Sequence, residues 1–269
     1  MDFTTFKNVL SVEHARLINY LLYGGIGVGK TFFARTCATP LIVDCFDPGG
    51  YQSLIQPGKD PNNPPLELGK NLMVFDFSDE NPTAPTQYLN WVESMQNRIT
   101  KGFFNHVGTY MLDSLTTFSS AIMNRVMQQN QKLHDPRATQ EKSEYGPAQN
   151  YMMSALRIIL SLPCHVIVTA HESVDKDELK GSIVTRTPAL IGKQRTAIPL
   201  LFSEIYRVTA EVADKGFKSF LQTAPCLQNQ ARTRIGGGIY ESFEEGTMRD
   251  LLKRVGIVLT NKPNFNEEV

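Results

Sequence analysis

A glycine-rich segment followed by lysine and threonine is the part of this sequence whose residue types and spacing most directly predict chemistry. Four residues separate Gly24 from Gly29, and Lys30 and Thr31 follow at once. This is the spacing of a phosphate-binding loop (P-loop), the strand–GxxxxGK[ST]–helix motif. Its glycines let backbone N–H groups surround polyphosphate oxygens, and the helix that follows adds its positive N-terminal end. We therefore expect Lys30 to bind the β and γ phosphates of a nucleotide and the Thr31 hydroxyl to bind Mg²⁺.

The predicted nucleotide site comprises the whole loop and the residue that follows it. Its expected members are Gly24, Gly25, Gly27, Val28, Gly29, Lys30, Thr31 and Phe32. An apolar run over residues 18–23 predicts the buried strand that leads into the loop. A chance match in a glycine-rich turn is the alternative, expected in roughly one chain of this length in a hundred at average composition.

A second acidic signature follows farther along the chain. An apolar run over residues 109–112 ends in Asp113 and Ser114. A strand that ends in an acid has the form of a Walker B strand, whose carboxylate holds Mg²⁺ through water. Many strands end in Asp, but this one comes about eighty residues after Lys30 in a chain of alternating strands and helices. We therefore expect Thr31 and Asp113 to share the metal.

Candidate catalytic side chains stand at two further predicted strand ends. Asp44 and Asp47 lie at the end of the apolar run 41–45, and His171 follows the run 165–170. Open α/β sheets bind ligands outside the C-terminal ends of their strands, so either carboxylate could polarise an attacking water. Either could instead cap the next turn. His171 could face the γ phosphate or hydrogen-bond a loop backbone.

Basic residues are concentrated in the second half of the chain. Residues 173–198 lack clear periodicity and predict a long loop or hairpin, which suits contact with a phosphate backbone. The candidate DNA-binding residues are Lys180, Arg186, Lys193 and Arg195. Strands are expected at 204–212 and 217–223, followed by Arg232 and Arg234. On a strand these two arginines would share a face and could reach the γ phosphate of a neighbouring subunit; surface salt bridging is the alternative.

The totals restrict the class of protein. The 269 residues carry 27 basic and 27 acidic side chains, so any contact with DNA must be a local patch rather than a basic coat. A hydrophobic content of 41% with 20% charged residues describes a folded chain. No apolar run approaches the ~18 residues of a membrane span, and the first ten residues lack a signal-peptide core. We therefore expect a cytoplasmic protein without membrane contact.

The motifs together resemble the RecA-like ATPase core. More closely, they resemble the phage-encoded nucleotide-binding proteins of the Sak-type single-strand annealing and recombination group. The likeness covers residues 19–240 and is carried by LLYGGIGVGKT, VDCFDPGG, YMLDSLTTF, VTAHE, the PALIGK–IPLLFSEIYRV region and ARTR. It implies an α/β fold with a mainly parallel central sheet flanked by helices, to which we add a C-terminal antiparallel extension. We expect an entry segment at 1–17, the core at 18–240, and a helix with a polar tail at 241–269.

The resemblance also implies an activity. It predicts an ATPase that uses ATP and Mg²⁺, acts on single-stranded DNA in phage recombination or annealing, and hydrolyses ATP between subunits of a ring or filament. A single-strand DNA-binding protein is a further expected partner, and the host cytoplasm is the expected location.

Individual positions take expected roles from the same resemblance. Asp47 or Asp44 would replace the usual catalytic glutamate, His171 would act as the sensor, and Tyr51 would stack on adenine. Lys193 and Arg195 would fall in or near a DNA-binding loop, although that loop lacks an aromatic residue. Arg232 and Arg234 resemble the paired basic fingers of ring-forming relatives.

Two other classes of function stay open at this point. The zero net charge and mixed acidic and basic residues suit a nucleotide-gated switch or assembly factor for a protein partner, without DNA binding. A translocating motor such as a helicase ranks last, because the sequence shows no accessory DNA-engaging domain.

Overall fold

A computed structural model describes residues 17–55, 65–79, 81, 84–133, 140–177, 181–214 and 216–265. Almost all of the predicted entry segment, Lys180 and the last four residues of the tail lie outside these ranges. The predicted limits of 1–17, 18–240 and 241–269 stay predictions.

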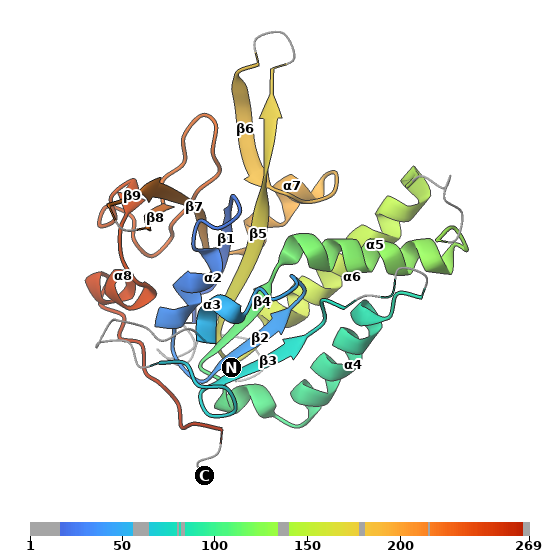
Figure 1. The fold of residues 1–269 in the computed structure, drawn as a ribbon, viewed down its shortest axis with the longest axis horizontal. Helices are drawn as coiled ribbons and strands as arrows, with labels where there is room; N and C mark the ends of the chain where they lie inside the picture. Colours follow the sequence, from blue (N-terminus) through green and yellow to red (C-terminus); the bar gives the residue numbers. More distant parts are fainter. Residues whose placement is uncertain are drawn as a thin grey trace, which may run out of the picture.

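Within the described residues, one large sheet organises the chain (Figure 1). Its parallel part runs in the order β3 (Leu72–Asp76), β2 (Leu41–Cys45), β4 (Thr109–Asp113), β5 (His165–Lys176), β1 (Asn19–Gly24) and β7 (Glu204–Val212). The antiparallel strands β8 (Phe217–Gln222) and β9 (Phe243–Glu244) continue it beyond β7. β1, β2 and β4 are buried on both faces, which explains why they occur in the sequence as continuous apolar runs.

Helices cover both faces of this sheet. One core cluster lies under α4 (Gln87–Thr100), α5 (Leu115–Gln129) and α6 (Lys142–Leu160). The other lies under α2 (Lys30–Phe33), the 3₁₀ turn η2 (Ala34–Thr36), α3 (Gln52–Ile55) and α8 (Met248–Arg254). Among the described helices, none is long and apolar enough to cross a membrane. The expected α/β fold with a mainly parallel sheet, flanking helices and a C-terminal antiparallel extension is confirmed.

The parallel register brings the predicted motifs to one edge of the sheet. Gly24 at the end of β1 pairs with His171 on β5, and Cys45 at the end of β2 pairs with Asp113 at the end of β4. β5 lies between β1 and β4. The P-loop, the Walker B acid and the sensor candidate therefore meet at the carboxyl edge, where open α/β sheets bind ligands.

The basic segment is more ordered than the sequence predicts. β5 continues past the sheet to Lys176 and pairs antiparallel with β6 (Ile183–Pro188), so that the two strands form a hairpin that projects from the body (Figure 1). The short helix α7 (Gln194–Ala197) and the 3₁₀ turn η4 (Pro199–Leu201) follow. Of the two structures predicted for this segment, a long loop or a hairpin, the hairpin is confirmed.

The apolar pattern of residues 148–162 predicts a helix that starts at about Ala148, but α6 begins six residues earlier, at Lys142. A capping box explains the difference, because Glu141 and Glu144 each accept a hydrogen bond from the other's backbone N–H. Gly146 and Pro147 both lie inside the helix. Because these residue types usually interrupt helices, a prediction from the sequence places the start of the helix after them.

The C-terminal segment is part of the same packed body. Met248, Leu251 and Leu252 of α8 are buried in the core cluster that contains the P-loop helix. The backbone N–H of Met248 donates to Oγ1 of Thr36 at 2.8 Å. The helix ends before Gly256, whose φ of 76° is the left-handed conformation that commonly ends a helix.

Candidate active site

The P-loop holds its lysine folded back on the loop itself. Lys30 begins α2 and is buried, and its Nζ donates to the carbonyl oxygens of Gly24 at 3.0 Å and Gly25 at 2.6 Å. Gly29, the N-cap of this helix, has a φ of 99°, which a residue with a side chain rarely adopts. Burial lowers the pKa of Lys30, and the nearby carboxylates Asp113 and Asp47 oppose that effect. Phosphate oxygens that bind at the loop can therefore replace the carbonyls of Gly24 and Gly25 as hydrogen-bond acceptors of the Lys30 ammonium group.

Strands β7 and β8 pack closely against the P-loop. A Cβ at Gly24 would clash with the carbonyl oxygen of Val208 on β7, and a Cβ at Gly29 would clash with Oγ of Ser219 on β8. That hydroxyl donates to the Val28 carbonyl at 2.8 Å. Ser219 is not among the predicted site residues, because a serine within an expected strand carries no signal of this contact.

The candidate metal ligands are joined directly. Oγ1 of Thr31 donates to Oδ2 of Asp113 at 2.8 Å, and the hydroxyl of Thr169 on β5 donates to Oδ1. Burial raises the pKa of Asp113, while the hydrogen bonds from Thr169 and Thr31 act in the opposite direction. A hydroxyl and a carboxylate are the hard oxygen ligands that Mg²⁺ prefers, so the residues present fit this ion.

Asp47 is the carboxylate that faces the P-loop edge. Its Oδ2 lies 3.1 Å from Nε2 of His171, and its Oδ1 accepts from Oγ of Ser114 at 2.9 Å and from the Thr117 hydroxyl. Burial alone would raise the pKa of Asp47, but the hydrogen bonds from His171, Thr117 and Ser114 outweigh burial and lower it. Asp47 therefore stays ionised beside the loop.

Asp44 serves a different purpose, and the structure contradicts a catalytic role for it. Its carboxylate is fully buried, and both oxygens bind the Arg98 guanidinium, at 2.8 and 2.7 Å. Trp91 Nε1 and Tyr110 Oη also donate to Oδ2, at 2.8 and 2.7 Å. These partners leave Asp44 neither a water to activate nor a turn to cap. Trp91 itself is buried in the core.

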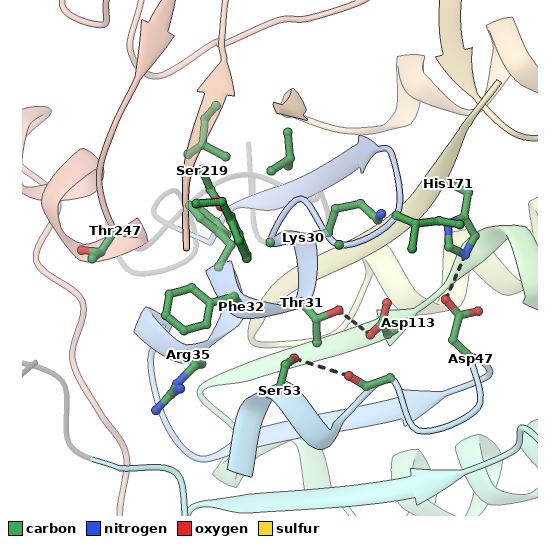
Figure 2. Close-up of a pocket in the computed structure, with 18 of the residues that line it drawn as sticks. Lys30, Thr31, Phe32, Arg35, Asp47, Ser53, Asp113, His171, Ser219 and Thr247 are labelled. Atoms are coloured by element: carbon green, nitrogen blue, oxygen red, sulfur yellow. Dashed lines mark hydrogen bonds and ion pairs between the residues drawn. The ribbon is translucent and has the colours of Figure 1, made fainter. Parts of the chain in front are cut away.

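One cavity of about 700 Å³ unites these groups (Figure 2). At one end it is lined by Lys30, Thr31, Asp47, Asp113 and His171. Gly27, Gly29 and Phe32 also line it, whereas Gly24, Gly25 and Val28 take part through the carbonyl contacts described above. Tyr51 does not line the cavity but packs against the core cluster under α2 and α8, and its expected stacking on adenine stays a prediction.

Comparison with known proteins agrees with this geometry. The family model described as an AAA domain matches residues 16–235, which is most of the chain. The chain belongs to this AAA domain family. It is thus a nucleotide-binding protein of the P-loop ATPase type. No curated protein sequence matches this AAA domain.

Three solved structures share a distant likeness with the AAA domain. A KaiC-like protein of Pyrococcus horikoshii OT3 is 13% identical with a TM-score of 0.41, covering 86% of this chain and 82% of that one. The flagellar accessory protein FlaH of Methanocaldococcus jannaschii is 11% identical with a TM-score of 0.41, covering 84% and 83%. An ATPase from the type III secretion system of pathogenic bacteria is 12% identical with a TM-score of 0.45, covering 91% and 65%.

The candidate DNA-binding residues of the AAA domain are spread over its hairpin and α7. Arg186 on β6 lies 3.8 Å from a Glu172 carboxylate oxygen, and Arg195 on α7 lies 3.1 Å from one of Asp175. Lys193 is exposed at the N-cap of α7. Lys180 lies outside the described residues. Two of the four predicted cations are thus already in ion pairs.

The two candidate finger arginines of the AAA domain do not share a strand face, which corrects the prediction. Arg232 forms a single β-bridge with Ile205, and its guanidinium donates to the backbone carbonyls of Pro199, at 3.2 Å, and Phe202. Arg234 is exposed, and its backbone N–H donates to the buried carboxylate of Glu204 at 2.8 Å. Only Arg234 of this pair is placed to meet another molecule.

Proposed function

We propose that this protein is a Mg²⁺-dependent ATPase that acts on single-stranded DNA in phage recombination or annealing. One observation carries the enzymatic part of the proposal. The ionised Asp47 and its partner His171 line the same cavity as Lys30, Thr31 and Asp113. A phosphate-binding cation, two metal ligands and a carboxylate held in place are the parts that phosphoryl transfer to water needs.

Each part has a task that follows from its contacts. Lys30 exchanges the carbonyls of Gly24 and Gly25 for phosphate oxygens, and Thr31 and Asp113 hold the metal. The bound Mg²⁺ would neutralise charge on the transferred phosphate. Asp47 orients a water molecule and accepts its proton. His171 keeps the Asp47 carboxylate turned toward the P-loop.

We further propose that hydrolysis takes place between subunits. Arg234 comes two residues after Arg232, which forms a β-bridge with Ile205 near the start of β7. At the start of β7, Glu204 pairs with Tyr20 of β1, whereas the P-loop begins after Gly24, at the end of β1. Four residues of strand separate these levels, which is about 13 Å. Arg234 is thus poorly placed for its own site, and head-to-tail association would bring it to the P-loop of a neighbour. This supports a ring or filament of identical chains.

The projecting hairpin is the part we assign to DNA. It stands clear of the sheet edge near His171, and Lys193 beside it is exposed (Figure 1). Its position supports coupling between a strand bound there and the nucleotide site. A single-strand DNA-binding protein is a natural partner for such an activity.

ATP turnover with and without single-stranded DNA tests this function. We expect DNA to stimulate turnover, and the stimulation to fall steeply from low to moderate salt, because phosphate contacts release counterions. Lys30→Ala should abolish turnover. Lys193→Ala should reduce only the stimulation, and Lys101→Ala, an exposed lysine after α4, is the matched control. Turnover that survives Lys30→Ala contradicts the assigned site.

A second function is favoured by the ion pairs on the hairpin. Because Arg186 and Arg195 already face Glu172 and Asp175, fewer free charges remain for DNA. Val174 and Val184 on the hairpin are 40% and 49% exposed, which suits an apolar contact with a protein. A nucleotide-gated switch for a protein partner would bind ATP, show no response to DNA, and bind its partner with little dependence on salt.

A further inference from the structure

The end of the cavity that lies away from the catalytic pair is apolar. Phe32 and Phe217 line it and are 53% and 56% exposed, and Val208 and Leu221 line it with them. Phe217 also lies beside the P-loop, because its Cε2 is 4.0 Å from the position that a Cβ would take at Gly29. A molecule held at the P-loop therefore meets two half-exposed aromatic rings within the same cavity.

The ring of Phe32 has Arg35 as a neighbour at this end. The guanidinium carbon of Arg35 lies 5.1 Å from the ring centroid, a cation–π arrangement that holds the ring from one side. Phe32 directly follows Thr31, the candidate metal ligand. Figure 2 shows Phe32 and Arg35 on the side of Lys30 and Thr31 that is away from His171. The aromatic end is thus one residue from the phosphate-binding end.

The Ser219 and Thr247 hydroxyl groups at the apolar end each donate a hydrogen bond to another group of the protein. Oγ of Ser219 donates to the Val28 carbonyl at 2.8 Å. Oγ1 of Thr247 donates to Oδ2 of Asp250 at 2.6 Å and accepts from the Asp250 N–H at 3.1 Å. A hydroxyl has a single proton to donate. Neither group can therefore donate to the edge of a ligand ring without giving up a contact that the fold uses.

We propose that the apolar end is a nucleobase subsite that holds purines mainly by stacking on Phe217 and Phe32 and selects only weakly between adenine and guanine. The inference rests on the nucleotide-binding function proposed for the same cavity. Sites that hydrogen-bond a ligand reject analogues lacking that group by factors of about 10⁴, whereas apolar sites discriminate weakly. The substrate class is then purine nucleoside triphosphates in general.

Binding affinities for three ligands test the subsite. The full chain is titrated, with Mg²⁺, against ATP, GTP and inorganic tripolyphosphate, which has no base. We expect the dissociation constants of ATP and GTP to agree within about tenfold. Phe217→Ala should weaken both by about tenfold or more, the usual loss of one stacking partner, and leave tripolyphosphate unchanged.

Two further variants keep the test independent of folding. Phe217→Leu retains apolar contact without an aromatic face and should give a smaller loss than Phe217→Ala. Phe243→Ala is the matched control, because this phenylalanine is 54% exposed on β9 and does not line the cavity. All three affinities should be unchanged in that control.

The outcomes separate this inference from the proposed ATPase. GTP binding more than a hundredfold weaker than ATP, or equal affinities in wild type and Phe217→Ala, would overturn the stacking subsite. Tight binding of ATP and GTP without turnover would contradict hydrolysis and leave the subsite standing. Failure of all three ligands to bind would overturn both.

Discussion

Nε2 of His171 lies 3.1 Å from Oδ2 of Asp47, and the two side chains come from strand ends 124 residues apart in the chain. The contact ties the candidate catalytic carboxylate to the strand that continues into the projecting hairpin. A displacement of that hairpin that moves His171 would therefore change a hydrogen bond of Asp47.

Removing a hydrogen-bond donor from Asp47 should change the pH dependence of turnover. The pKa of Asp47 is held low by His171, Thr117 and Ser114 against the effect of burial. In Thr117→Val one donor is lost, the pKa rises, and the acid limb of the kcat profile should move to higher pH. Turnover measured from pH 3 to 8 covers the acid limb of both proteins and checks this. An unmoved acid limb would show that Asp47 is not the group that must be ionised.

Asp47→Asn should reduce kcat by about 10²-fold or more, because the amide cannot accept a proton from water. The nucleotide dissociation constant should change little, since Lys30, Thr31 and Asp113 are untouched. Single-turnover kinetics and titration calorimetry measure the two effects. Equal loss of binding and turnover would contradict a role for Asp47 in the chemical step.

Asp44→Asn should affect stability instead of chemistry. Its carboxylate is the buried partner of Arg98, and removing one member of a buried ion pair costs about 3–5 kcal/mol. Urea unfolding measures the loss. Asp76→Asn is the control, because Asp76 is exposed at the end of the neighbouring strand β3. A loss below about 1 kcal/mol in Asp44→Asn would contradict a structural ion pair.

His165 should make the protein less stable in mild acid. Burial and the nearby Lys262 lower the pKa of His165 to about 4, so the unfolded chain binds its proton more readily than the folded one does. Stability should fall as the pH drops from ~6.5, the unfolded value, toward 4, by up to about 3 kcal/mol.

Unfolding at pH 7 and at pH 4.5 tests this dependence in two matched variants. His165→Asn keeps an acceptor for the Ile18 N–H, which bonds Nδ1 at 3.2 Å, and should lessen the loss in acid. His106→Asn changes an exposed histidine and should leave the loss as in wild type. The prediction fails if both variants behave alike.

Two adjacent P-loop glycines should differ in their tolerance of alanine. A Cβ at Gly24 meets the Val208 carbonyl, which is backbone and cannot move aside, whereas a Cβ at Gly25 meets only Cγ1 of Val28 at 3.7 Å. Thermal unfolding should therefore show a lower Tm for Gly24→Ala by several degrees and little change for Gly25→Ala. Equal Tm values would contradict the close approach of β7.

Much of the fold follows from the sequence because its parallel strands are buried on both faces. β2 and β4 begin and end at the predicted residues, since a strand without a solvent face is a continuous apolar run. The start of α6 was missed because its capping box precedes a proline and a glycine. A local pattern of breakers cannot reveal that the helix continues through them.

The choice between Asp44 and Asp47 lies beyond local sequence. The two carboxylates are three residues apart at one strand end, but Asp44 is bound by Arg98, Trp91 and Tyr110, which are 47 to 66 residues away. Arg232 likewise looked like a free cation until Pro199 and Phe202 supplied its carbonyl partners. Such assignments depend on tertiary partners rather than on spacing.

The contact between Ser219 and Val28 has a consequence for how the protein is made. The two residues are 191 positions apart, so the ribosome adds Ser219 roughly 10–40 s after Val28 at ordinary rates of synthesis. During that interval the P-loop exists without the strand that supports its back. A nascent chain therefore gains the support for the back of its P-loop only after the ribosome has passed Ser219, and full nucleotide binding becomes a sign that synthesis has reached β8.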